Sequence, residues 1–140
     1  MAIKVMNVIQ RAHETMKREI IHNTSKMHTW IHVYVKPGDI DDMHCSSEDQ
    51  TFYVVEGQCT MHFPGGEKAV MIPGMIALIQ GGDFFQLENT GDGPMILLGN
   101  RSGPHGVTKH INYELGKDIK ELSTEEIGRI RDSGRSTTSS

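Results

Sequence analysis

The chain has 140 residues, and 14 lysines and arginines against 18 aspartates and glutamates give it a formal net charge of −4. This balance argues against a nucleic-acid partner or an anionic membrane surface, because phosphate contacts need a basic surface. No stretch approaches the ~20 apolar residues of a transmembrane helix, and the first residues lack the apolar core of a secretory signal. A cytoplasmic protein is therefore expected.

The first 26 residues are predicted to form an N-terminal arm, in which residues 8–18 fit either a short helix or an irregular segment. Residues 27–105 are predicted to form one domain. Within it, short runs rich in β-branched and aromatic residues alternate with Gly- and Pro-containing turns, which is typical of a sandwich or barrel. The predicted strands span residues 27–35, 51–55, 58–63, 69–72, 75–79, 84–87 and 94–98.

A short helix is predicted within a C-terminal extension of residues 106–134. Ser123 and Glu126 have the spacing of a capping box, in which the hydroxyl accepts from the amide of residue 126 and the carboxylate reaches back. Gly134 provides the stop. Residues 135–140 are small and polar, and we expect them to form a disordered tail.

A more specific pattern begins at Gly38. The spacing of Gly38, His44, Ser46, Gln50 and Gly57 resembles the first motif of the cupin family, G-x5-H-x-H-x(3,4)-E-x6-G. Both glycines and the first histidine are in register with that motif. Ser46 stands at the position of the second histidine, and Gln50 stands at the position of the glutamate.

A second cupin motif is matched in its frame but not in its histidine. The family pattern is approximately P-G-D-x4-P-x-G-x2-H-x3-N-T-G, and here Pro73, Gly74, Gly82 and residues 89–91 keep the frame, with Phe85 at the histidine position. The resemblance covers residues 27–105. It implies an all-β protein with a single cupin double-stranded β-helix, or jelly-roll barrel, to which the short C-terminal helix is added.

The resemblance also implies a divalent metal held inside the barrel by three histidines and a carboxylate. Only His44 remains of these four ligands, and typical sites need three or four good ligands. No cofactor is therefore expected, although a transition metal in a rebuilt site of His32, His44 and Glu48 remains an alternative. His28, His32 and His62 are otherwise interpreted as partly exposed or hydrogen-bonded sheet residues. Whether His28 or His32 faces the pocket stays open.

The predicted pocket combines an apolar wall with a few polar groups, the usual make-up of a small-molecule site. His44 is the candidate catalytic residue, because imidazole is the side chain suited to proton transfer near neutral pH. No acidic partner for it is visible in the sequence. The candidate ligand-binding residues are Ser46, Gln50, Phe52, Phe85 and Leu87.

Three functions from different classes fit this pocket. The first is a small-molecule-binding protein that acts as a metal-independent isomerase, lyase or cyclase through its lone pocket histidine. The second is a non-catalytic binding or regulatory module. The third is a metal-dependent oxygenase or lyase with a rearranged ligand set, which Phe85 disfavours. The expected partners are a small-molecule ligand and a second copy of the chain in a homodimer, with no nucleic acid and no membrane.

Overall fold

The computed structural model describes residues 3–104 and 109–118. In this part of the chain there is one helix, α1 (Val8–Thr15), followed by strands only. The strands are β1 (Glu19–Asn23), β2 (Met27–Tyr34), β3 (His44–Ser46), β4 (Gln50–Glu56), β5 (Cys59–His62), β6 (Lys68–Met71), β7 (Ile76–Ile79), β8 (Gln86–Asn89), β9 (Met95–Ser102) and β10 (His110–Asn112).

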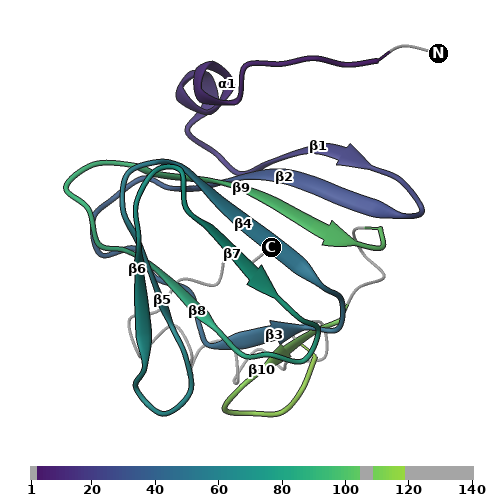
Figure 1. The fold of residues 1–140 in the computed structure, drawn as a ribbon, viewed down its shortest axis with the longest axis vertical. Helices are drawn as coiled ribbons and strands as arrows, with labels where there is room; N and C mark the ends of the chain where they lie inside the picture. The colour runs from purple at the N-terminus through teal and green to yellow at the C-terminus, as the bar shows by residue number, and fades with distance from the viewer. Residues whose placement is uncertain (1–2, 105–108, 119–140) are drawn as a thin grey trace.

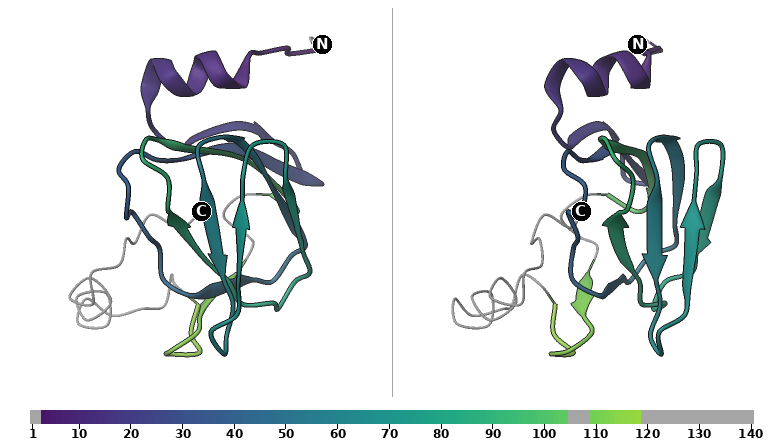
Figure 2. Two further views of the ribbon diagram at one scale, coloured as in Figure 1. Left: turned by 60° about the vertical axis from the view of Figure 1, so that its left-hand side comes forward. Right: turned by 90° about the vertical axis from the view of Figure 1, so that its left-hand side faces the viewer.

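The strands form a barrel of antiparallel sheets. The largest sheet has the order β1-β2-β9-β4-β7, a second has the order β6-β5-β8, and β3 pairs with β10. An isolated bridge between His44 and Phe85 connects β3 to the start of β8. β3 and β10 lie together at the lower end of the barrel, while α1 lies outside the strands, above β1 and β2 (Figures 1 and 2).

The main core fills the space between the sheets, as expected when alternate residues of each strand point inward. Burial of this apolar surface is the main contribution to stability that the described residues offer. The buried members of this core are Trp30, Tyr34, Phe52, Val54, Cys59, Met61, Met71, Phe85, Leu87, Met95 and Leu97.

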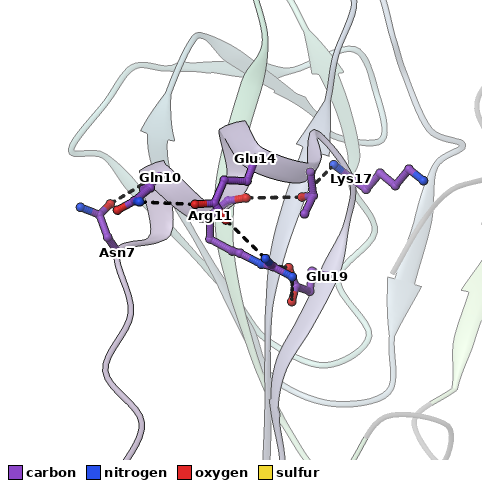
Figure 3. Close-up of polar contacts among 7 residues, drawn as sticks. Asn7, Gln10, Arg11, Glu14, Lys17 and Glu19 are labelled. Carbon is purple, nitrogen blue, oxygen red and sulfur yellow. Dashed lines mark hydrogen bonds and ion pairs between the residues drawn. The ribbon is translucent and has the colours of Figure 1, made fainter.

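A second, smaller apolar cluster lies on the outer face of the large sheet, where Ala12 of α1 packs against Ile31 and Ile96. Asn7 caps the helix by accepting from the Gln10 amide at 3.0 Å, and Met16 ends it in the left-handed conformation at φ 48°. Arg11 joins the helix to β1 through two hydrogen bonds to the Glu19 carboxylate, 2.7 and 3.1 Å long (Figure 3). The helix therefore covers apolar side chains that the sheet would otherwise expose.

The fold is mostly β, as predicted, and the predicted strands are found with shifts of one or two residues at their ends, except that β9 runs four residues beyond the predicted end at residue 98. The prediction did not include β1, β3 and β10, of which β1 lies in the predicted arm and β10 in the predicted extension. Residues 8–15 settle the open question at the N-terminus in favour of a helix. The predicted C-terminal helix and tail lie outside the described residues. No helix among the described residues is long and apolar enough to span a membrane.

Candidate functional site

The inner wall of the barrel is defined by the register of β2, β9 and β4. Residues directly opposite one another in neighbouring strands share a face of the sheet. One row across these three strands is Trp30, Gly99 and Phe52, and the next row is His28, Arg101 and Gln50. All six positions contribute to one inward surface, so the three strands together form a single wall.

His44 lies on β3 and faces this wall, and only 2% of it is exposed. Its Nδ1 lies 2.9 Å from the backbone carbonyl oxygen of Asp42. Because a carbonyl oxygen can only accept, Nδ1 carries the hydrogen, and Nε2 of the neutral ring keeps a free lone pair. The neutral imidazole is therefore held in the tautomer that a general base requires at Nε2.

An aromatic chain connects His44 to the opposite wall. The ring of His44 lies 4.7 Å from that of Phe85, and Phe85 lies 5.9 Å from Phe52. Phe52 contacts Trp30 edge-on at 5.5 Å and His32 at 5.6 Å. The structure thus brings the predicted residues His44, Phe52 and Phe85 together, and adds the two aromatic residues of β2 to them.

His28 and His32 were interpreted as partly exposed or hydrogen-bonded sheet residues, and the structure buries both on the inner face of β2, where His32 is hydrogen-bonded. His28 is fully buried and stacks on Trp30 at 5.0 Å. His32 accepts a hydrogen bond at Nδ1 from the Trp30 indole, at 3.2 Å. Burial, followed by electrostatic interactions with Arg18 and His44, lowers the pKa of His32 to about 3. Neutral His32 therefore carries its hydrogen on Nε2, which is buried and has no hydrogen-bond partner among the described residues.

His62 lies on β5 away from this interior. Its Nε2 is 2.8 Å from Oε1 of Glu88 on the neighbouring β8, and both side chains are partly exposed. His62 is therefore a hydrogen-bonded sheet residue, as interpreted from the sequence.

Asp41 supplies an acidic group beside His44 that the sequence did not reveal. Its side chain is 1% exposed, and Oδ1 accepts a hydrogen bond from the Leu87 amide at 2.8 Å. Burial raises the pKa of Asp41 to about 6, and the largest opposing influence is its electrostatic interaction with His44. This interior carboxyl group therefore keeps its proton to a higher pH than an exposed aspartate would.

The remaining predicted pocket residues are all buried, but they differ in what they offer. Ser46 Oγ accepts from the Glu48 amide at 3.1 Å, so this hydroxyl stabilises the turn after β3. Gln50 Oε1 has no hydrogen-bond partner among the described residues. Leu87 belongs to the apolar core. Gln50 is therefore the predicted polar residue with an acceptor to offer a ligand.

Two hollows open beside the interior. One, of ≈ 420 Å³, is lined by Phe63, Phe84, Phe85 and Ile79 among others. The other, of ≈ 500 Å³, includes Gln50 and Ile79. Since Phe85 and Gln50 also face the barrel interior, these hollows mark the side on which the site approaches the surface.

The residues present do not fit a tightly held transition metal. Across residues 3–104 and 109–118, no group of three or more His, Cys, Asp or Glu side chains is placed to hold an ion. Glu48, a member of the alternative site with His32 and His44, instead accepts from Ser102 Oγ at 3.1 Å. Phe85 offers no donor atom, and the Ser46 hydroxyl is a poor ligand.

Sequence reasoning missed the two arginines of this interior. Arg101 is 2% exposed, and Arg18 precedes β1 directly. Arg101 has the same parity along β9 as the buried residues Met95 and Leu97, which is the signal that could have placed it inward. The predicted strand ended before it, at residue 98.

Comparisons with known proteins agree with this architecture. Residues 31–99 match the family model described as "Cupin domain". A search of curated proteins finds no match.

Three solved structures illustrate the likeness. An uncharacterized conserved protein with a double-stranded beta-helix domain from Klebsiella pneumoniae has a TM-score of 0.65 and 17% identity, covering 78% of this chain and 97% of that one. KdgF from Halomonas sp. has a TM-score of 0.58 and 19% identity, covering 64% of this chain and 79% of that one. A cupin-2 domain containing protein from Shewanella frigidimarina has a TM-score of 0.59 and 13% identity, covering 70% of this chain and 94% of that one. At these identities the likeness shows the fold alone.

Proposed function

This chain belongs to the cupin superfamily, and we propose that it binds a small molecule inside its barrel and catalyses a metal-independent proton transfer on it. Isomerisation, elimination and cyclisation are the reaction classes that need such a step. His44 is the general base or acid of this reaction.

The observation that carries the proposal is the fixed tautomer of His44. The hydrogen bond from Nδ1 to the Asp42 carbonyl, at 2.9 Å, leaves Nε2 as the acceptor of the neutral ring. The Phe85 ring at 4.7 Å packs against the imidazole and limits its rotation. A general base held in one tautomer and one orientation is what proton transfer requires.

Asp41 supports the same proposal as a second proton-exchanging group. Burial raises its pKa to about 6, and His44 is close enough to influence that value. A pair of titratable groups with different environments is a common arrangement for acid and base roles. An isomerisation that removes a proton on one side and returns one on the other uses such a pair.

The test uses the incorporation of deuterium, because this label reports proton exchange whatever the product is. Wild-type protein is incubated in D2O and EDTA with a mixture of small metabolites, and mass spectrometry follows deuterium uptake and conversion. We expect at least one compound to react, and we expect His44→Gln to lower its rate by about 10²- to 10⁴-fold. His62→Gln is the matched control, because His62 bonds to Glu88 outside the interior.

The outcomes separate the candidate functions. A rate that survives in His44→Gln removes this histidine from the mechanism, and a rate abolished by EDTA in the wild type supports the metal-dependent alternative. Binding without conversion or deuterium uptake supports the non-catalytic module.

A further inference from the structure

Two arginines meet at the same aromatic ring inside the barrel. Cζ of Arg101 lies 5.2 Å from the centre of the Trp30 ring, and Cζ of Arg18 lies 5.8 Å from it. Arg101 comes from β9, where it pairs with His28. Arg18 lies one residue before Glu19, which pairs with Ile31, so the same register places Arg18 beside His32.

The two guanidinium groups share one feature, an edge of the planar group whose nitrogens have no hydrogen-bond partner among the described residues. The Nε and Nη2 atoms of Arg18 and of Arg101 are buried and have no hydrogen-bond partner among the described residues. These two nitrogens form one side of the planar group, and their parallel N–H bonds match the two oxygens of a carboxylate or phosphate. The third nitrogen of Arg101, Nη1, lies 3.1 Å from Nε2 of His110.

No carboxylate balances the two charges within the described residues. The ion pairs found there involve Arg11, His13 and His62, and neither Arg18 nor Arg101 takes part in one. Burial and the charge of Arg18 lower the pKa of Arg101 to about 10, and the opposing charge of Glu48 does not offset them. Buried like charges that form no ion pair are strongly unfavourable, and an anion bound between them would offset this cost.

We propose that Arg18 and Arg101 bind the oxyanionic group, carboxylate or phosphate, of the barrel's small-molecule ligand. This inference rests on the proposed function to the extent that the ligand occupies the same interior. Nη1 of Arg101 lies 3.1 Å from Nε2 of His110, and the ring of His110 lies 6.1 Å from that of His44, so an anion held by the arginines lies near the proposed base. Positive charge at that place also stabilises the negative charge that develops when a proton is removed next to a carboxylate.

The test measures the binding of three matched probes by calorimetry in the presence of EDTA: benzoate, phenyl phosphate and the neutral benzyl alcohol. Emission of Trp30, the one tryptophan in the sequence, gives a second readout from the site. We expect an anionic probe to bind more tightly than benzyl alcohol, and the preference between benzoate and phenyl phosphate identifies the group. Arg18→Gln and Arg101→Gln should each weaken anion binding by about tenfold or more, as expected for the loss of a charged two-bond contact.

Arg11→Gln is the matched control, since Arg11 pairs with Glu19 and Glu14 on the outside of the molecule. It should leave anion binding unchanged. A readout without ligand is also available, because removing an unpaired buried charge should leave the thermal midpoint of Arg101→Gln unchanged or raise it. A structural arginine would instead lower the midpoint when replaced.

Four results would overturn the inference. In the wild type these are equal binding of anionic and neutral probes, or no anion binding at all. In the variants they are wild-type anion affinity in both Arg18→Gln and Arg101→Gln, or unfolding of Arg101→Gln. Failure of the proposed function is a different result. Arginine-dependent anion binding that persists while the wild type shows neither conversion nor deuterium uptake contradicts the role of His44 and leaves the arginine site standing.

Discussion

The indole ring of Trp30 lies directly against Gly99 of the neighbouring strand. A Cβ atom added at Gly99 would lie 2.5 Å from two atoms of that ring. Trp30 is fully buried, and the same ring contacts His28 and both interior arginines. Because Gly99 has no side chain, the Trp30 ring packs directly against the backbone of β9. This contact therefore fixes the position of the ring and of the inner-wall residues that touch it.

We expect Gly99→Ala to destabilise the protein by about 1–3 kcal/mol, because an overpacked core displaces a large side chain or the backbone. The measurement is urea unfolding followed by tryptophan fluorescence, which reports on Trp30 itself. Gly93→Ala is the control, since a Cβ there meets no atom within 4 Å, and it should change stability by less than about 0.5 kcal/mol. Wild-type stability and emission in Gly99→Ala would contradict the contact.

We predict that replacing Asp41 by the isosteric asparagine changes the stability of the protein in a pH-dependent way. Its pKa rises from 3.8 to about 6 on folding, so the folded protein holds the proton more tightly between these values. The contribution of this carboxyl to the free energy of unfolding is fully present below pH 3.8 and is lost as pH rises through 6. Asp41→Asn keeps the oxygen that accepts from Leu87 and should be more stable relative to wild type at pH 7.5 than at pH 4, by up to about 3 kcal/mol.

The stability of the variant must be compared with that of the wild type at the same pH, because the titration of His32 changes the stability of both proteins in the opposite direction. Its pKa is lowered to about 3, so its contribution is present above pH 6.5 and is lost as pH falls toward 3. This effect cancels in the difference. An equal difference for Asp41→Asn at both pH values would contradict the raised pKa of Asp41.

The sequence predicted strands where β-branched and aromatic runs are long, and it missed strands that are short and polar. β3 and β10 have three residues each, and β1 reads Glu-Ile-Ile-His-Asn. None of them carries the alternation that marks a strand in isolation. They form because partners are present: β3 and β10 pair with each other, and β1 adds to the edge of β2.

For the candidate site, strand parity correctly placed Phe52 and the motif residue His44 inside, but it ended β9 too early. Gly99 and Asn100 look like a turn, so Arg101 was left outside the predicted strand. Gly99 lies within β9 because a neighbouring ring occupies the space of its side chain, a use of strand glycine that a single sequence does not reveal. The interior arginines therefore became visible only with the register.

Metal content is the last prediction. We expect purified protein to contain well under one transition metal per chain by elemental analysis, including after growth with added iron, manganese, nickel or zinc. One imidazole from His44, an amide from Gln50 and the hydroxyl of Ser46, which already accepts from the Glu48 amide, make a weak donor set. The double variant Ser46→His/Phe85→His is the matched comparison, since it adds two imidazoles beside His44 and should raise the metal content. A stoichiometric metal in the wild type that resists EDTA would contradict the prediction, and it would transfer the chemistry of the cavity from His44 to the ion.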